Sequence, residues 1–227
     1  MSSVKSTTSS EVKSRSQPVW IYFYNLVSSI SWAGVFFFNV FPGILINQQP
    51  DLFKNTYKYL IGVQSLAIVE IYNSAVGNVR APLFTTIAQV FSRLLIVVGI
   101  FTVLPNSPPN YKWYYVTLST AWSITEIVRY SYYAINIKSN GSPPTFLTFL
   151  RYNLFLVLYP MGISSECLII YNSLTDATSN IHLLYAWFLK ICLATYIPGS
   201  YILYTYMLKQ RKKVMKKIAV EYSKKKF

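Results

Sequence analysis

The stretch PLFTTIAQVFSRLLIVVGIFTVL, which spans residues 82–104, decides the fold class of this chain. A helix needs about 20 mostly apolar residues to cross the hydrocarbon core of a bilayer, and this stretch is long enough with a single charge, Arg93. Runs of the same character precede and follow it, at roughly residues 19–41, 57–76, 113–137, 146–172 and 183–208. The sequence therefore predicts an all-α polytopic membrane protein, a bundle of six transmembrane helices.

The composition excludes several classes of protein. Hydrophobic residues make up 53% of the chain and charged residues only 12%, whereas soluble domains carry about 25% charged residues. Cys167 and Cys192 both lie in apolar runs, which excludes a disulfide-stapled secreted fold and a cysteine zinc site. His182 is the single histidine, which argues against a histidine metal cluster and a Ser-His-Asp triad.

The basic residues predict the orientation of the bundle. The formal net charge is +14, and the excess lies in two tails, one with Lys5, Lys13 and Arg15 and the other after residue 208. An even number of spans places both tails on one side, and the positive-inside rule makes that side cytosolic. We thus expect a disordered cytosolic tail at 1–17, a membrane domain at 18–208 and a basic cytosolic tail at 209–227.

The partners of the basic tail are predicted from its position. Its charge adjoins the membrane spans and not a soluble domain, which favours anionic lipid over nucleic acid as its partner. The last four residues, Lys-Lys-Lys-Phe, are similar to a dilysine signal for retrieval to the endoplasmic reticulum.

Ionisable residues occur inside or beside the predicted spans, where each costs at least about 2.5–3.5 kcal/mol at the helix centre. They are Glu70, Arg93, Glu126, Arg129, Arg151, Glu166 and Lys190. The i, i+3 spacing of Glu126 and Arg129 predicts an ion pair on one helix. For Glu70 we predict a pairing with Arg93 across two helices.

Glu166 has no nearby base on its own helix, and its helical neighbours are mostly apolar. Burial disfavours a charged carboxylate, which suits a group that exchanges a proton near neutral pH. Tyr159 precedes Glu166 by two helical turns, so both project from nearly the same face, about 10 Å apart along the axis. Pro160 and Gly162 between them predict a kink. The alternative is a structural glutamate that is hydrogen-bonded to another helix.

Three blocks of sequence, in the same order and with short loops, resemble the (3R)-3-hydroxyacyl-CoA dehydratase family, also called protein-tyrosine-phosphatase-like A. The blocks are Val69-Glu70-Ile71 through Gly77-Asn78-Val79-Arg80 to Gln89-Val90-Phe91-Ser92-Arg93, then Trp122-Ser123-Ile124-Thr125-Glu126-Ile127-Val128-Arg129-Tyr130, and Leu150-Arg151-Tyr152-Asn153-Leu154-Phe155-Leu156-Val157-Leu158-Tyr159-Pro160-Met161-Gly162 followed by Glu166. The resemblance covers roughly residues 20–208. Asn73 departs from it, since many members carry histidine there, and this bears on packing more than on activity.

The resemblance implies the third step of very-long-chain fatty-acid elongation, in the endoplasmic-reticulum membrane. Water leaves a 3-hydroxyacyl-CoA to give trans-2-enoyl-CoA, a reaction that needs no metal or other cofactor. The family's catalytic pair falls on Tyr159 and Glu166, and its functionally sensitive arginines and glycine fall on Arg93, Arg151 and Gly162. The implied partners are the acyl-CoA substrate, membrane lipid and the other elongation enzymes, a condensing enzyme and reductases.

Topology adds candidates for holding the phosphates of CoA, because these stay in the cytosol. Arg80, Arg129, Lys138 and Arg151 lie near the cytosolic ends of their predicted spans. The alternative is that these residues are ordinary positive-inside charge.

Two other functions compete with the dehydratase. A phosphatase of the cysteine class needs an arginine six positions after the nucleophile, but Ser173 follows Cys167 at that distance and Pro198 follows Cys192, so we dismiss it. A non-enzymatic scaffold or transporter of the endoplasmic reticulum is compatible with intramembrane charges.

Overall fold

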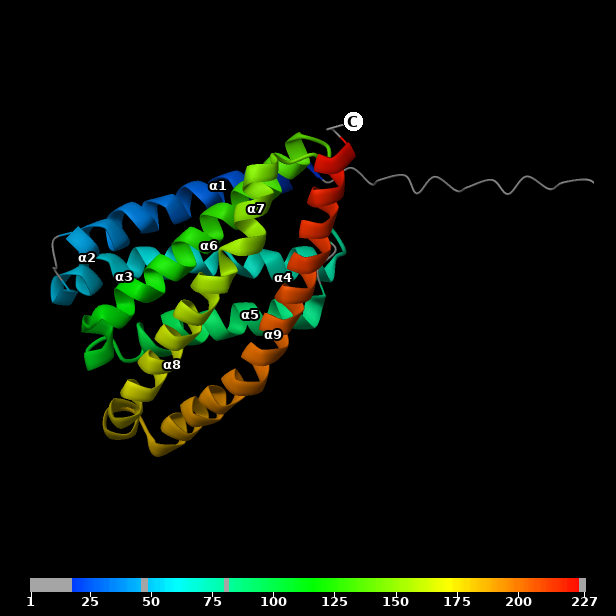
Figure 1. Ribbon diagram of the computed structural model, residues 1–227. Helices are drawn as coiled ribbons and strands as arrows, with labels where there is room; N and C mark the ends of the chain where they lie inside the picture. Colours follow the sequence, from blue (N-terminus) through cyan, green and yellow to red (C-terminus); the bar gives the residue numbers. More distant parts are fainter. Residues whose placement is uncertain (1–17, 46–48, 80–81, 225–227) are drawn as a thin grey trace, which may run out of the picture.

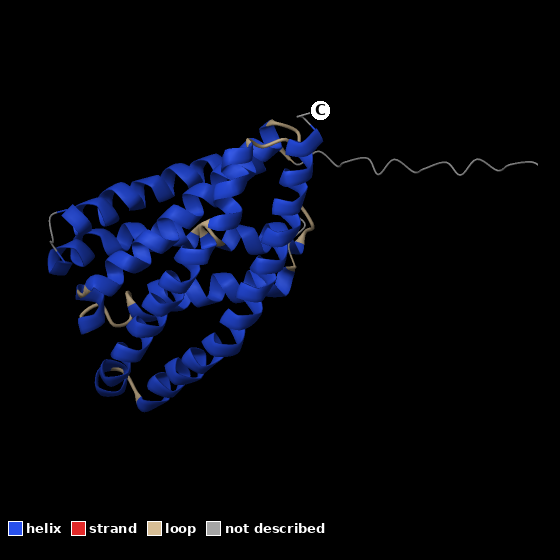
Figure 2. Ribbon diagram, in the orientation of Figure 1, coloured by secondary structure: helices blue, strands red, loops and turns tan. Residues whose placement is uncertain are grey.

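The computed structural model describes residues 18–45, 49–79 and 82–224, and across these ranges it contains helices and turns but no strand (Figure 2). The helices are α1 (Val19–Val35), α2 (Phe41–Leu45), α3 (Gln49–Ser65), α4 (Ile68–Ala75), α5 (Leu83–Leu94), α6 (Trp113–Lys138), α7 (Thr145–Asn153), α8 (Phe155–Asn180) and α9 (Leu183–Lys224). A π-helical turn at Phe36–Val40 joins α1 to α2, and a second at Leu95–Ile100 extends α5. A short 3₁₀ helix, Pro108–Tyr111, precedes α6.

All six apolar runs of the sequence lie on helices, and four helical segments of the described chain are long and apolar enough to cross a membrane. They are Val19–Leu45, Leu83–Ile100, Thr145–Asn180 and Leu183–Val220. The pair α3 and α4 is interrupted after Ser65 and carries charges near its start, while α6 is rich in tyrosine, serine and threonine. The chain is therefore an all-helical, multi-pass membrane protein.

Successive segments run back and forth between two ends of the molecule (Figure 1). The start of α1 and the ends of α4, α6 and α9 lie toward the right-hand and upper side of the view, and the turn between α8 and α9 lies at the bottom. The described chain thus begins and ends at the same end of the bundle.

Helix α6 lies at the centre of the bundle and is packed between α1 and α8. Ser131 on α6 shares a 2.8 Å hydrogen bond with Ser29 on α1. On the α8 side, a Cβ added to Gly162 would lie 3.4 Å from the Cβ of Ala121, which marks a close crossing of two helices. Small residues permit such approaches between membrane helices, where packing and not the hydrophobic effect drives association.

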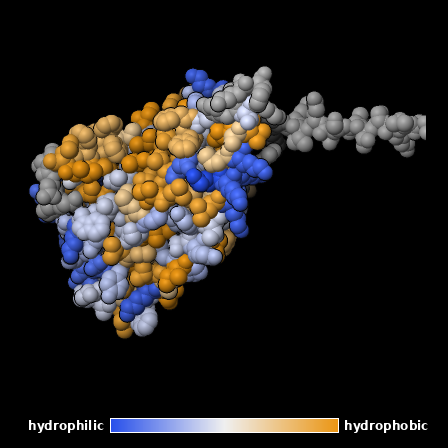
Figure 3. Space-filling model, in the orientation of Figure 1, coloured by the Kyte–Doolittle hydropathy of each residue, from blue (hydrophilic) through white to orange (hydrophobic). Residues whose placement is uncertain are grey.

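Large apolar side chains cover much of the outer surface. Phe84, Val157 and Ile197 are each at least 70% exposed. On the face in Figure 3, hydrophobic residues cover wide areas and hydrophilic ones gather near the end of α9. Apolar patches of this extent need a non-aqueous neighbour, and a bilayer provides one.

The interruption of the fifth run differs from the expected one. The structure ends α7 at Asn153 and begins α8 at Phe155, whereas Pro160 lies inside α8. Leu154 between the two helices keeps helical backbone angles, so the interruption is slight. Next to it, Arg211 Nε of α9 donates a 2.9 Å hydrogen bond to Asn153 Oδ1. The basic segment after residue 208 accordingly continues α9 as helix through Lys224.

Candidate functional site

Four charged side chains form one network between α4, the α5 segment and α6. Arg129 binds both oxygens of Glu70, at 2.9 and 2.5 Å, and its Nε donates a 2.6 Å hydrogen bond to Glu126. Arg93 pairs with the other oxygen of Glu126. The predicted pair of Glu126 and Arg129 is confirmed, and the predicted pair of Glu70 and Arg93 is wrong, because Glu70 faces Arg129 and Glu126 lies between the two arginines.

The network contains two positive and two negative groups, so it is neutral overall. Tyr130 adds a hydrogen bond to Glu70, and Tyr24 from α1 lies 3.3 Å from the Tyr130 hydroxyl. Buried ions that are paired and hydrogen-bonded in this way tie helices together. The guanidinium groups of Arg93 and Arg129 are therefore already paired with carboxylates of the chain itself.

Glu166 lies apart from that network, on the face of α8 that packs on α6 and α9. It is 6% exposed. Trp122 Nε1 from α6 donates a 2.9 Å hydrogen bond to one carboxyl oxygen, and the Tyr196 hydroxyl from α9 donates a 2.8 Å hydrogen bond to the other. The guanidinium of Arg93 lies 5.7 Å from the centre of the Trp122 ring, so Trp122 connects Glu166 to the ion network.

Tyr159 is half-buried on the same side of α8. Its hydroxyl donates a 3.3 Å hydrogen bond to the Ser200 carbonyl of α9, and its ring stacks on Tyr204 at 5.7 Å. Tyr196 and Ser200 are four residues apart and therefore lie on one face of α9, about one turn from each other. Tyr159 and Glu166 thus meet the same stripe of α9, as their seven-residue spacing predicts.

An open groove of about 740 Å³ runs between α8 and α9 directly beside this pair. Tyr196 and Ser200, the two partners of Glu166 and Tyr159, belong to its wall. We call it the α8–α9 groove. Glu166 and Tyr159 are not among the residues that line the groove, but each is hydrogen-bonded to one that does. A buried carboxyl and a phenol held this close together can act as a base and an acid on a molecule that reaches them.

Arg151 occupies a separate aromatic cage near the end of α7. Its guanidinium carbon lies 4.6 Å from the ring centre of Tyr132, 4.3 Å from that of Tyr133 and 5.6 Å from that of Tyr152. Nη2 donates a 2.8 Å hydrogen bond to the Tyr133 hydroxyl, while Nε and Nη1 are buried and have no hydrogen-bond partner among the described residues. Two buried charged donors that the chain leaves unpaired suit an anionic ligand.

The other candidates from the sequence lie in different settings. Lys138 is exposed in the last turn of α6. Gly162 is buried against Ala121 of α6 and lets α8 approach the helix that carries Trp122. Arg80 lies outside the described residues.

Sequence reasoning missed Trp122 and Tyr196, the two donors to Glu166. Each is on a different helix from the carboxyl, so no spacing along the chain connects them. The available signal is chemical, since a buried carboxyl requires donors. With 20 tyrosines in the chain, that requirement does not single out Tyr196.

Comparisons with known proteins point to one family. Residues 64–217 match the family described as "Protein tyrosine phosphatase-like protein, PTPLA", a range that contains the ion network, Arg151, Tyr159, Glu166 and the groove. No solved structure matches this chain.

Curated relatives match over most of their length. The chain is 38% identical to a Schizosaccharomyces pombe protein named "Probable very-long-chain (3R)-3-hydroxyacyl-CoA dehydratase", over 88% of this chain and 94% of the relative. It is 35% identical to the Caenorhabditis elegans protein "Very-long-chain (3R)-3-hydroxyacyl-CoA dehydratase hpo-8", over 85% of this chain and 92% of the relative. It is 32% identical to "Very-long-chain (3R)-3-hydroxyacyl-CoA dehydratase PASTICCINO 2" of Arabidopsis thaliana, over 88% and 94% respectively.

Proposed function

Because this chain belongs to the protein tyrosine phosphatase-like (PTPLA) family, we propose that it is a hydro-lyase that converts very-long-chain (3R)-3-hydroxyacyl-CoA to trans-2-enoyl-CoA. This is the third step of the fatty-acid elongation cycle. One observation supports it above the others: Glu166 and Tyr159 both reach the α8–α9 interface, where their partners Tyr196 and Ser200 wall a groove.

The reaction needs two proton movements, and this pair supplies both. Glu166 takes the proton from the carbon next to the thioester, and that carbon's electrons form the new double bond. As the bond to the 3-hydroxyl breaks, Tyr159 gives its phenolic proton to the departing oxygen, which leaves as water. One proton transfer from the protonated Glu166 to the Tyr159 phenolate, directly or through that water, restores the enzyme.

Two hydrogen-bond donors orient the Glu166 carboxylate for the proton transfer. Trp122 and Tyr196 each hold one oxygen, so the carboxylate keeps a fixed orientation between α6 and α9. Preorganised donors of this kind need no rearrangement when the charge changes. The hydrogen bond from Tyr159 to Ser200 is long at 3.3 Å, which leaves the phenol easy to redirect toward a substrate hydroxyl.

Arg151 is the residue we assign to the phosphates of CoA. Its two unpaired donors are buried in the tyrosine cage, eight residues before Tyr159 and roughly 12 Å from it along the helix axis. Lys138 adds positive charge in the last turn of α6, while Arg80 stays a candidate from the sequence alone. Arg93 and Arg129 act indirectly, by holding α5 and α6 around Trp122.

We further propose that the six helical passes all cross the membrane, with both termini in the cytosol and the protein in the endoplasmic reticulum. The back-and-forth course of the helices and the basic end of α9 support this arrangement. The enzymes that make 3-hydroxyacyl-CoA and reduce enoyl-CoA are then its natural partners, since they share these two intermediates.

The test is turnover by the purified protein. Wild-type protein in detergent or proteoliposomes is incubated with a 3-hydroxyacyl-CoA, and enoyl-CoA is measured by mass spectrometry. Glu166→Gln and Tyr159→Phe should each lose about 10²–10⁴-fold in kcat, the usual contribution of general acid–base catalysis. Tyr206→Phe, at an exposed tyrosine of α9, is the matched control and should keep full activity.

Two results would overturn the proposal. Full activity in folded Glu166→Gln protein would remove Glu166 from the chemistry. The absence of any enoyl-CoA from folded wild-type protein would leave the scaffold or transporter as the better reading.

A further inference from the structure

The α8–α9 groove has a defined course and chemistry. Along α8 its wall extends from Ile163 to Leu174, and along α9 from Lys190 to Ser200, so it is roughly 16 Å long at 1.5 Å per residue. The middle of the groove is lined mainly by apolar side chains. Polar groups gather at its two ends.

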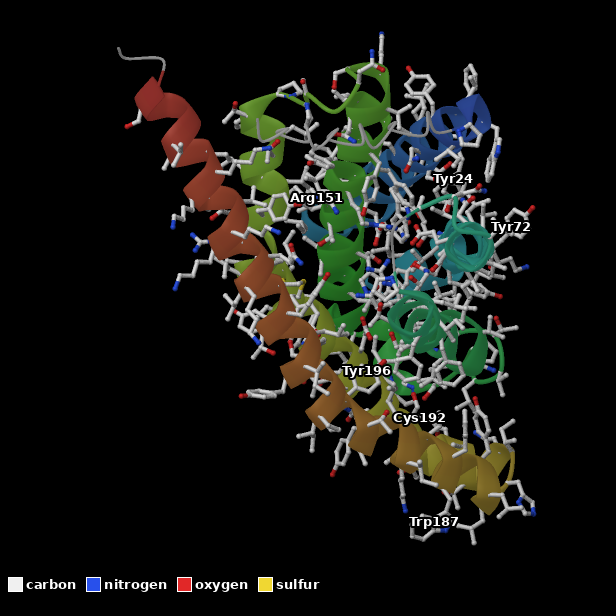
Figure 4. All side chains as sticks on the ribbon, turned by 90° about the vertical axis from the view of Figure 1, so that its right-hand side faces the viewer. Tyr24, Tyr72, Arg151, Trp187, Cys192 and Tyr196 are labelled. Carbon is white, nitrogen blue, oxygen red and sulfur yellow. The ribbon has the colours of Figure 1, made fainter. Side chains whose placement is uncertain are left out.

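At one end of the groove, two residues of its wall are hydrogen-bonded to the catalytic pair. Tyr196 lines the groove and donates to Glu166, while Ser200 lines the groove and accepts the hydrogen bond from Tyr159. A molecule lying in the groove therefore contacts, at this end, the hydrogen-bond partners of Glu166 and Tyr159. Figure 4 shows Arg151, Tyr196 and Trp187 in this order down the molecule.

The other end of the groove is polar. Lys190 lines it, with its ammonium group 4.6 Å from the ring centre of Trp187. A smaller hollow of about 360 Å³ adjoins it, where Thr175, Thr178 and Ser179 stand beside the same lysine. Lysine, tryptophan and hydroxyl-bearing residues gather where a membrane protein meets the lipid headgroups. This end of the groove therefore has the composition of a membrane interface, while the middle of the groove is apolar.

On these grounds we propose that the α8–α9 groove is the acyl-chain site of the enzyme, and that the substrate tail enters it sideways from the bilayer. This inference rests on the proposed function. Anion site, reactive pair and apolar groove follow one another along α7 and α8, which is the order of phosphates, thioester and hydrocarbon tail in an acyl-CoA. The side of the groove is open: Ile197 of its wall is 77% exposed, and Ile191 beside the groove on α9 is 63% exposed.

The groove aligns the tail more than it adds affinity. Lipid tails are as apolar as the groove, so moving a chain from one to the other changes its environment little. What the groove fixes is direction: a tail lying in it holds carbons 2 and 3 against Glu166 and Tyr159. Chains longer than the groove continue past Lys190 or bend out into lipid.

A bulky residue inside the groove tests this directly. Ala194 lines the groove, and Ala194→Phe would fill part of it. Ile191→Phe places the same ring on the exposed side of α9, outside the groove, and is the matched control. Both variants and the wild type are assayed with a short, water-soluble 3-hydroxyacyl-CoA and with one of more than 18 carbons.

We expect Ala194→Phe to lower kcat/KM for the long substrate by about tenfold or more, as a mismatch of one or two carbons in an apolar pocket does. Turnover of the short substrate should stay near the wild-type value, and Ile191→Phe should change neither. Equal losses for both substrates, or no loss for either, would overturn the groove proposal. Failure of the wild type on both substrates would instead overturn the proposed function.

Photolabelling provides a readout that does not depend on turnover. A 3-hydroxyacyl-CoA with a diazirine near the end of its tail should label peptides within 163–174 and 190–200, and excess unlabelled substrate should suppress the labelling. A phospholipid with the same diazirine tail is the comparison. If it labels these peptides equally and unlabelled substrate does not compete, the groove is a site for bulk lipid and the proposal is wrong.

Discussion

At the scale of the residue, the carboxyl of Glu166 depends on two donors from other helices. Tyr196→Phe removes the donor to one oxygen and leaves the ring in place. A hydrogen bond to a charged group contributes about 1.5–3 kcal/mol. We expect kcat to fall about tenfold or more with KM nearly unchanged, and steady-state kinetics on the purified variant will measure both.

Trp122→Phe removes the other donor and should behave like Tyr196→Phe. If these substitutions acted through misfolding, melting temperature and yield would fall along with kcat. Tyr185→Phe serves as the control, because its 2.5 Å hydrogen bond goes to the Gly99 carbonyl, away from Glu166. An unchanged kcat in Tyr196→Phe would show that Glu166 does not need this partner.

Arg151 provides a second prediction at this scale. Arg151→Lys keeps the positive charge but loses the planar guanidinium group, which stacks on the rings of Tyr132 and Tyr133. We expect KM for acyl-CoA to rise about tenfold in Arg151→Lys and further in Arg151→Gln, with kcat less affected. Acyl-pantetheine, which lacks the nucleotide phosphates, should be handled equally by wild type and variants.

The acyl-pantetheine comparison decides between two roles of Arg151. A loss that is the same for both thioesters would place Arg151 in the support of α7 and not in phosphate binding. Lys138→Gln, at an exposed lysine, should change KM only slightly.

The charged residues also mark the limit of sequence reasoning at this scale. The pair of Glu126 and Arg129 was predictable, because three residues on one helix fix their separation. The partner of Glu70 was not, since it depends on how α4 and α6 are rotated against each other. The same holds for Glu166, whose donors come from α6 and α9.

At the scale of the element, Gly162 sets the distance between α8 and α6. Its added Cβ would lie in ordinary contact, 3.4 Å from the Cβ of Ala121, so Gly162→Ala should fold and keep most of its activity. Gly162→Leu cannot fit and should push α8 away from Trp122. Thermal melting and turnover will show both effects, and Gly199→Leu, at a glycine of α9 with open space around it, is the control.

A normal rate in Gly162→Leu would contradict this view of the α6–α8 contact. The other reading of Gly162, direct contact with substrate, predicts instead that Gly162→Ala already loses activity while its melting temperature stays unchanged.

The interruption between α7 and α8 shows why boundaries were harder to predict than helices. Pro160 was the sequence signal for a kink. The structure instead separates α7 from α8 at Leu154, where the backbone angles stay helical, next to Asn153, whose side chain is hydrogen-bonded to Arg211 of α9. That contact joins residues 58 positions apart, and a local signal cannot report it.

At the scale of the whole molecule, the neutral network of Glu70, Arg93, Glu126 and Arg129 joins three elements that are distant in sequence. Arg93→Met leaves an uncompensated negative charge, and breaking a buried pair in this way costs about 3–5 kcal/mol. We expect a large drop in melting temperature. The double variant Arg93→Met/Glu126→Gln retains the balanced pair of Glu70 and Arg129 and should lose less than the sum of its single changes.

The arrangement of six passes is tested by glycosylation in microsomes. An Asn-X-Thr acceptor inserted at the α8–α9 turn, beside Ile181, should be modified, because the proposed orientation puts this turn in the lumen. The native Asn140-Gly141-Ser142 sequence should stay unmodified, because the same orientation puts it in the cytosol. Modification at Asn140 would reverse the orientation.

The six apolar runs made the all-helical fold predictable, yet they differ in their surroundings. The segments that contain α1, α5, α8 and α9 are long and apolar enough to cross a membrane. Helix α6 is less apolar, because it lies at the centre and its Ser123, Glu126 and Tyr130 are buried against neighbouring helices.

Helix α9 supplies one side of the α8–α9 groove, and it is also the last described helix of the chain. During synthesis on the ribosome, α1 to α8 therefore enter the membrane before Tyr196 and Ser200 exist. A chain in which α9 has not yet packed on α8 lacks one of the two donors to Glu166, the acceptor for the Tyr159 hydroxyl and one wall of the groove.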